Sequence, residues 1–168
     1  MTMKRIRIPS TPFRMRSLKV GDRILLEGKV YTGRDATLPK LVKAIKSGEP
    51  PVNLDGAAIM HTAVSGAGIA PTSSNKEEIE ENMPFLASAG VLIHIGKGAL
   101  KRETIDALDE AGAIFVVTPP LAALLTSRVK SRKLIAYKED GMEALYELRV
   151  DGLPGIVGAA HGKSIYHL

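Results

Sequence analysis

Hydroxyl and ammonium groups gather in residues 68–98. A Thr-Ser-Ser run at 72–74 stands just before an expected helix, and helix N-termini attract anions because their first N–H groups lack internal partners. Lys97 lies between two glycines. It follows an expected apolar strand over 91–95 and precedes the next expected helix. Ligands of open α/β sheets collect at this carboxyl end of the strands. The stretch therefore predicts a binding site for a small acidic molecule.

An arginine and a histidine elsewhere in the chain could serve the same site. Arg34 follows an expected strand in a Gly-Arg-Asp turn, and its guanidinium fork can grip a carboxylate through two hydrogen bonds. The alternative is that Arg34 pairs with Asp35 or with a helix end. His61 follows an expected buried strand over 56–60 and could act as an acid or a base. Its alternative is a histidine that is only hydrogen-bonded, and the sequence leaves both alternatives open.

Alternating strands and helices must position these side chains. Apolar runs predict buried strands over 56–60, 91–95 and 113–117. Helical spacing predicts helices over 38–46, from near Asn75 with a kink or split at Pro84, over 100–111 and over 121–129. This alternation is typical of an α/β fold with parallel strands.

Further β segments flank this alternating region. They are two short strands around a turn at Gly28, a strand over 144–150 and a final strand over 156–160. We therefore expect a three-layer β/β/α arrangement with a mostly parallel central sheet. Residues 1–18 are expected to form an N-terminal arm or edge strand, because prolines interrupt their alternation, and residues 19–168 a single domain.

The length, charge and residue types of the chain exclude several classes of protein. The 168 residues suit one domain with a substantial core. The net charge of +5 comes from dispersed basic residues that do not interleave with aromatics, which disfavours nucleic-acid binding and suits acidic substrates. No cysteine is present, which excludes thiol catalysis and an iron–sulfur cluster bound by this chain's own thiolates. With no apolar run long enough to span a membrane and no signal-peptide core, a cytoplasmic location is expected.

Several nucleotide- and metal-binding motifs can be rejected. Residues 155–164 end in Gly-Lys-Ser, but Val157 stands where a phosphate-binding loop needs glycine, and too few residues follow to form its helix. Residues 66–68 lack the third glycine of a dinucleotide fingerprint. The four histidines are isolated from one another, so no metal site is predicted.

Five short motifs, taken in order, are similar to those of one enzyme family. They are Tyr-Thr-Gly-Arg-Asp at 31–35, Pro-Thr-Ser at 71–73, Gly-Lys-Gly at 96–98, Gly-Met-Glu-Ala at 141–144 and His-Gly-Lys-Ser-Ile-Tyr at 161–166. From Lys19 onward the chain resembles the β subunit, or C-terminal domain, of the iron–sulfur hydro-lyases, which comprise class I fumarases and L-tartrate dehydratases.

The resemblance implies a swivelling β/β/α domain and the reversible hydration of a small dicarboxylate, with fumarate/malate expected first and tartrate next. It also implies a four-iron four-sulfur cluster held by three cysteines of a separate α subunit, in a heterodimer or heterotetramer. This chain would be the half without the cluster. We expect an apolar face for that partner, and a homodimer when the chain is alone.

The resemblance also assigns roles by position. Thr72 would be the catalytic base, and Lys97 would bind a carboxylate or assist Thr72. The expected substrate-binding residues are Arg34, Ser73, Lys76 and His61. A threonine hydroxyl is a weak base, so it would need nearby cations and a closed, dry site.

The sequence departs from the family pattern in the region of the expected site. Ala63-Val64 replaces a Gly-Pro pair, and the loop from there to Pro71 is shorter. Ala70 replaces a glycine, Lys76 replaces an arginine and Lys163 replaces an asparagine. Lysine keeps the charge of arginine but loses the bidentate fork. Two alternatives therefore stand beside the leading hypothesis: a diverged relative with another hydroxy-acid substrate, and a non-catalytic binding or assembly module on the same fold.

Overall fold

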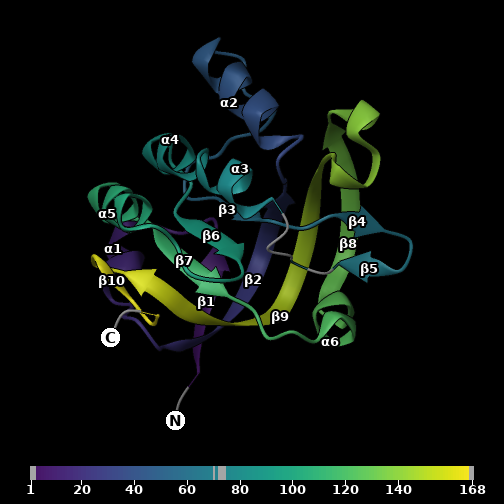
Figure 1. Cartoon of the computed structure of the whole chain (residues 1–168). Coiled ribbons are helices and arrows are strands. Elements are labelled where there is room, and N and C mark those ends of the chain that lie inside the picture. Colours follow the sequence, from purple (N-terminus) through teal and green to yellow (C-terminus); the bar gives the residue numbers. More distant parts are fainter. Residues whose placement is uncertain (1–2, 70, 72–74, 167–168) are drawn as a thin grey trace.

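A mixed β-sheet organises the chain (Figure 1). The computed structural model describes residues 3–69, 71 and 75–166. Within these residues one sheet contains eight strands: β1 (Lys4–Ile8), β2 (Arg23–Thr32), β3 (Ala58–Met60), β6 (Ile93–Gly96), β7 (Ile114–Val117), β8 (Val129–Ala136), β9 (Leu145–Ala160) and β10 (Lys163–Ser164). A separate small hairpin joins β4 (Val64–Ser65) to β5 (Gly68–Ile69).

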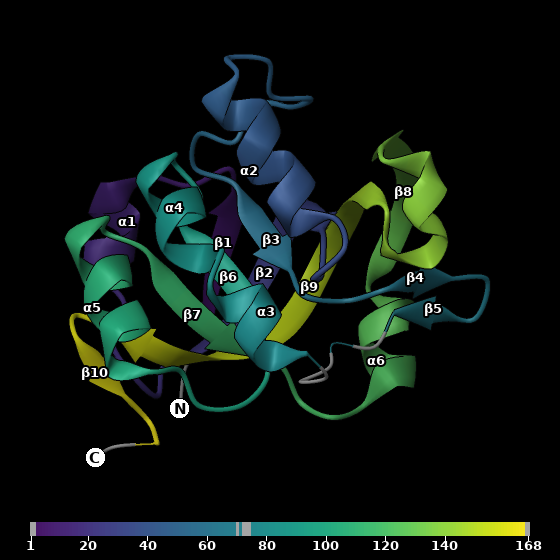
Figure 2. The ribbon, with the colours of Figure 1, turned by 45° about the horizontal axis from the view of Figure 1, so that its top comes forward.

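Short helices connect the strands. They are α1 (Pro12–Arg16), α2 (Leu38–Lys46), α3 (Lys76–Glu80), α4 (Met83–Ser88), α5 (Arg102–Glu110), α6 (Ala122–Ser127) and the 3₁₀ segment η1 (Lys138–Glu143). Helices α3, α4 and α5 gather on one side of the sheet, and α6 lies beside β5 and β8 (Figures 1 and 2). No helix in the described part of the chain is both long and apolar enough to cross a membrane.

The sheet closes on itself. Strands β2, β3, β6 and β7 pair in parallel, each with the next. Strand β9 then runs antiparallel to both β7 and β2, and so completes a ring of five strands. Strand β1 pairs in parallel with β2, while β8 and β10 pair with β9.

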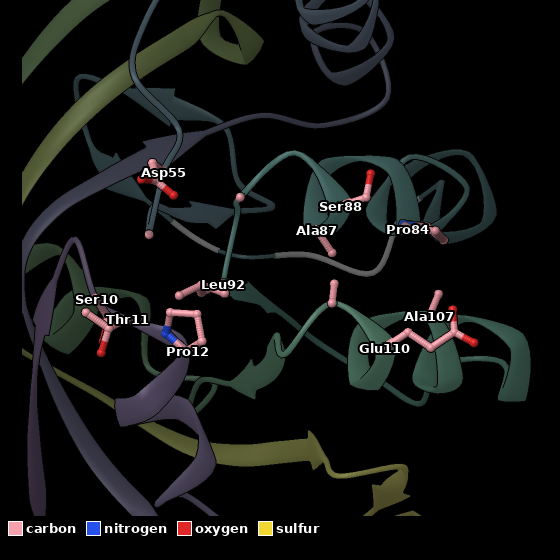
Figure 3. Close-up of a pocket in the computed structure, with 13 residues that line it drawn as sticks. Ser10, Thr11, Pro12, Asp55, Pro84, Ala87, Ser88, Leu92, Ala107 and Glu110 are labelled. Carbon is pink, nitrogen blue, oxygen red and sulfur yellow. The ribbon is translucent and has the colours of Figure 1, made fainter.

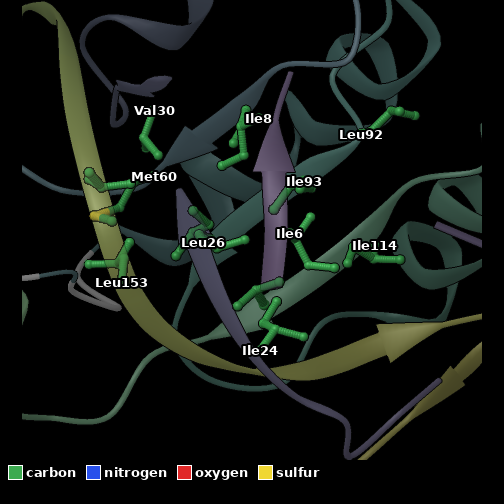
Figure 4. Packing of buried hydrophobic residues seen from close by; sticks show 14 of the residues in the cluster. Ile6, Ile8, Ile24, Leu26, Val30, Met60, Leu92, Ile93, Ile114 and Leu153 are labelled. Atoms are coloured by element: carbon green, nitrogen blue, oxygen red, sulfur yellow. The ribbon is translucent and has the colours of Figure 1, made fainter. Parts of the chain in front are cut away.

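Side chains alternate along the strands, so the buried residues pack on both faces of the closed sheet. One set of alternating residues forms a single large cluster, which includes Val30, Met60, Ile93, Ile114 and Leu153 (Figure 4). Their neighbours in sequence pack instead beneath the helices, as Ile59 does against α2 and Phe115 against α5. Burial of apolar surface on both faces of the ring is the main stabilising contribution.

The first 18 residues share this core. Strand β1 contributes Ile6 and Ile8 to the large cluster, and the segment around α1 contributes Met15 and Leu18. Strand β1 is an edge strand, with β2 as its neighbour among the described residues. The division of the chain at residue 18 stays a prediction, as does the assignment to a three-layer swivelling domain.

Two strand predictions were wrong. The expected turn at Gly28 is instead a position within one continuous strand, β2, where a bulge shifts the register between Leu26 and Glu27. Gly28 is needed there because a Cβ would lie 2.1 Å from the Ile8 carbonyl oxygen of β1. The two strands expected over 144–150 and 156–160 are likewise one strand, β9.

The helix predictions were more accurate. Helix α2 spans 38–46, as the apolar spacing predicts. The expected break at Pro84 is also confirmed: α3 ends at Glu80, and Pro84 lies in the first turn of α4, where its missing N–H is tolerated.

Candidate active site

The carboxyl ends of the parallel strands bring predicted site residues together. Arg34 follows β2, His61 follows β3 and Lys97 follows β6. His61, Lys76 and Lys97 line one small cavity of about 10 Å³, together with Ile79, Glu80, Met83, Leu100 and Phe115. This volume is about that of one water molecule. Three of the residues predicted from the sequence therefore share one site.

His61 is an uncharged side chain in this site. It is 4 % exposed, and burial lowers its pKa to about 3, helped by the nearby His94, Lys76 and Arg34. Its ring lies against Gly96, where a Cβ would stand 2.8 Å from Nδ1. Its Nε2 has no hydrogen-bond partner among the residues that the structure describes. His61 can therefore donate or accept a hydrogen bond at neutral pH, but it supplies no positive charge.

Lys76 is held by a buried carboxylate that the sequence analysis missed. Its Nζ lies 3.0 Å from Glu80 Oε1. The other oxygen of Glu80 accepts hydrogen bonds from Thr104 Oγ1 at 2.6 Å and from the Lys101 backbone N–H at 2.8 Å. Burial alone would raise the pKa of Glu80, but these three donors outweigh it and lower the pKa. The signal in the sequence is the Lys76–Glu80 spacing of four residues on a helix.

Lys97 has a different environment. It is partly buried, and its ammonium forms no ion pair within 4.0 Å in the described ranges 3–69, 71 and 75–166. An ammonium at a strand end with no protein carboxylate beside it is suited to bind the carboxylate of a ligand.

Arg34 lies next to the segment η1. Its side chain is 13 % exposed, and Nη1 lies 3.9 Å from Glu143 Oε2. The alternative that Arg34 pairs with Asp35 is not what the structure shows, since Asp35 Oδ2 accepts a hydrogen bond from Asn75 Nδ2 at 3.1 Å. The charge of Arg34 contributes to the lowered pKa of His61, so Arg34 belongs to the electrostatic environment of the site.

The two hydroxyl residues predicted for catalysis and binding, Thr72 and Ser73, lie outside the described residues. The structure resumes at Asn75, which stands at the N-terminus of α3 with a left-handed backbone (φ 55°). The structure therefore describes Lys76, whereas the catalytic role of Thr72 stays a prediction.

His94 is a second buried histidine that the sequence analysis missed. It lies on β6 and is fully buried, with Nε2 3.1 Å from the Val91 carbonyl oxygen. Burial lowers its pKa to about 4. Its place within an apolar strand gave no sign of a role, but its ring influences the pKa of His61.

A much larger cavity lies at the opposite end of the strands. It has a volume of about 690 Å³ and is bordered by α1, α4, α5 and the residues just before β3 and β6, including Asp55, Leu92 and Glu110 (Figure 3). None of the predicted site residues that the structure describes, Arg34, His61, Lys76 and Lys97, lines it. The larger volume of this cavity therefore does not mark it as the candidate site. The predicted site residues His61, Lys76 and Lys97 lie instead around the small cavity at the carboxyl ends of the strands.

Comparison with known proteins gives a consistent match. The family described as "Fumarase C-terminus" matches residues 2–168. A protein of Methanocaldococcus jannaschii named "Putative L(+)-tartrate dehydratase subunit beta" is 32% identical over 168 residues, covering 90% of this chain and 85% of that protein. The Escherichia coli K12 protein named "L(+)-tartrate dehydratase subunit beta" is 28% identical, covering 95% of this chain and 86% of that protein.

A longer relative matches over only part of its length. The Geobacillus stearothermophilus protein named "Putative fumarate hydratase class I" is 29% identical and covers 96% of this chain, but the match spans 33% of that protein. The chain thus corresponds to most of each β subunit and to about a third of this fumarate hydratase.

Proposed function

The chain belongs to the fumarase C-terminus family, and we propose that it is the β subunit of a hydro-lyase that adds water to, or removes it from, a small dicarboxylate. The observation that carries the proposal is the match over residues 2–168. Two relatives named as β subunits of tartrate dehydratase have similar length, which supports a subunit rather than a whole enzyme.

The proposed substrate is fumarate or malate, with tartrate as the next candidate. Each carries two carboxylates, so a site for either needs two positive groups. In the proposal, Lys97 binds one carboxylate and Arg34 the other. Lys97 is suited to this role because no carboxylate of the described residues pairs with it, and Arg34 because its guanidinium is mostly buried and can form two parallel hydrogen bonds.

Proton transfer is proposed to involve Thr72. During dehydration the base takes a proton from one carbon and the hydroxyl group leaves the neighbouring carbon as hydroxide. The proton and the hydroxide together make up the water that is lost, and hydration reverses both steps. The ammonium of Lys97 would stabilise the deprotonated hydroxyl. His61 stays neutral because its pKa is about 3, so in the proposal it orients the substrate through a hydrogen bond.

The iron–sulfur cluster implied by the resemblance does not fit this chain. The sequence has no cysteine, and the described residues hold no group of three side chains that could bind a metal. In the proposal the cluster therefore belongs to a separate cysteine-bearing α subunit.

The proposal is tested by expressing the chain with such an α subunit under anoxia and assaying fumarate, L-malate and the tartrates. We expect turnover of at least one acid. Lys97→Met should lower kcat/KM by about 100-fold, because it removes a charge at the reacting end of the site. Lys43→Met, at an exposed position on α2, is the matched control and should leave turnover unchanged. A complex with a loaded cluster that converts none of these acids would contradict the proposal.

One observation favours a second candidate, a diverged relative with another hydroxy acid as substrate. Lys76 stands where the resemblance implies an arginine, and its charge is already paired with Glu80 at 3.0 Å. Turnover of a hydroxy acid other than malate or tartrate would favour this candidate. A complex whose rate survives changes at both Lys97 and Thr72 would favour a non-catalytic module.

A further inference from the structure

A row of residues crosses the parallel strands at the end where the proposed site lies. Thr32, Met60, Ile95 and Val116 are consecutive partners across β2, β3, β6 and β7. The pairing continues past β2 and β3, because Gly33 N–H donates to Met60 O at 3.0 Å and His61 N–H donates to Ile95 O at 2.8 Å.

Each member of this row is followed two residues later by a polar or charged residue just past the end of its strand. In the order of the strands these residues are Arg34, Thr62, Lys97 and Thr118. Two of these are the cations of the proposed site. Thr118 directly follows β7 as Lys97 directly follows β6, and the residues just before them, Val117 and Gly96, are paired across the two strands. No motif in the sequence pointed to Thr118.

The hydroxyl of Thr118 lacks a partner. The residue is 3 % exposed, and its Oγ1 is buried with no hydrogen bond to any described residue. Buried polar groups are normally hydrogen-bonded, so such a hydroxyl calls for an explanation. The threonine at the end of β2 is different: Thr32 Oγ1 donates to Ala144 O at 3.2 Å and accepts from Tyr146 N–H at 3.1 Å.

We propose that Thr118 is a further substrate-binding residue, whose hydroxyl donates a hydrogen bond to the carboxylate that Lys97 binds. A carboxylate is an acceptor with two oxygens, so it can take one hydrogen bond from the ammonium and one from the hydroxyl. The inference rests on the proposed function. It explains why a hydroxyl at the end of β7 is buried and has no hydrogen bond to the described residues.

The test compares three variants in the αβ complex. Thr118→Val keeps the shape of the side chain and removes the hydroxyl, whereas Thr118→Ser keeps the hydroxyl. Thr32→Val removes a hydroxyl that is bonded within the protein. Anoxic calorimetric titration with fumarate and with L-tartrate measures affinity, steady-state kinetics measures KM and kcat, and thermal unfolding without ligand measures Tm.

We expect Thr118→Val to weaken binding and raise KM about 10-fold, the loss typical of one hydrogen bond to a charged group. Its Tm should stay equal or rise, because no protein partner is lost. Thr118→Ser should bind as the wild type does. Thr32→Val should show the opposite pattern, with a lower Tm, because it leaves Ala144 O and Tyr146 N–H unpaired.

Two outcomes overturn the inference alone. In the first, the wild type binds an acid and Thr118→Val binds it equally well. In the second, Thr118→Val lowers Tm as Thr32→Val does, which would reveal a structural role. A wild-type complex that binds neither acid overturns the proposed function, and the inference with it.

Discussion

Glu80 shows how a single buried carboxylate can fix the position of a cation. It accepts hydrogen bonds from Lys76, Lys101 and Thr104 and is 5 % exposed. It therefore ties α3 to the start of α5 and holds Lys76 at the edge of the small cavity. In the proposed enzyme this makes Glu80 a positioning residue rather than a catalytic one.

Glu80→Gln should destabilise the protein by about 1–3 kcal/mol, because an amide replaces an ionised acceptor that three donors share. Urea unfolding at neutral pH measures the change. Glu78→Gln on the same helix is the control, since that side chain is exposed, and it should change stability by less than about 0.5 kcal/mol. Equal effects of the two substitutions would contradict the role given to Glu80.

The lowered pKa of Glu80 also makes the stability of the protein depend on pH. A carboxyl group whose pKa is lower in the folded state stabilises the protein above its unfolded pKa, and this contribution is lost as the pH falls through the folded pKa. The contribution of Glu80 is therefore complete at neutral pH, where the urea measurement is made.

The segment η1 illustrates how one element is docked by a few polar contacts. Asp140 accepts hydrogen bonds from Lys40 Nζ at 2.8 Å and Thr37 Oγ1 at 2.9 Å. Thr37 Oγ1 also lies 2.6 Å from the Glu143 carbonyl oxygen. These contacts hold η1 against the start of α2, and Glu143 of η1 is the carboxylate nearest to Arg34 in the described chain.

Asp140→Ala should loosen η1 more than Glu139→Ala does. Asp140 is 11 % exposed in its side chain and bonds two donors, whereas Glu139 is 66 % exposed and forms an ion pair with Lys40. We expect faster amide hydrogen exchange over 138–143 in Asp140→Ala and little change in Glu139→Ala. Unchanged exchange in both variants would show that other contacts dock η1.

Features of helices that depend on neighbouring residues could be predicted from the sequence. The span of α2 follows from its apolar spacing, and the break between α3 and α4 follows from the geometry of Pro84. The continuity of β2 and β9 could not be predicted, because it depends on partners distant in sequence: Gly28 is accommodated by the backbone of β1, and β9 by pairing with both β2 and β7.

The candidate site follows the same division. The places of Lys97, Arg34 and His61 at strand ends could be predicted because each follows an apolar run. Their roles in binding stay predictions. The spacing of Lys76 and Glu80 indicates an ion pair on a helix, but the burial of Glu80 and its bond to Thr104 could not be predicted. The burial of the Thr118 hydroxyl could not be predicted either. Such properties arise from packing between elements, which no local pattern records.

At the scale of the whole molecule, stability should depend on pH through a buried histidine. His94 has a pKa of about 4 in the folded protein, against about 6.5 in an unfolded chain. The unfolded state therefore binds more protons between these values, so stability falls as the pH drops from about 6.5 toward about 4. Between about pH 7 and pH 5, His94 alone should account for about 2 kcal/mol.

His94→Gln should remove this part of the dependence, since glutamine does not titrate and its amide can still reach the Val91 carbonyl. Free energies of unfolding in urea, measured at about pH 7 and pH 5, give the comparison. The variant should lose less stability on acidification than the wild type does. Equal losses of stability in the variant and the wild type would contradict the role given to His94.

The closing strand β9 has a consequence for the order in which the molecule can form. It pairs with β2, β7, β8 and β10, yet it begins only at residue 145. Until it is synthesised, the edges of β2 and β7 that it will cover stay open, and open strand edges invite pairing with other chains. Closure also joins residues far apart in sequence, which slows folding. The nascent chain therefore keeps these two strand edges open to aggregation until residues 145–160 have left the ribosome.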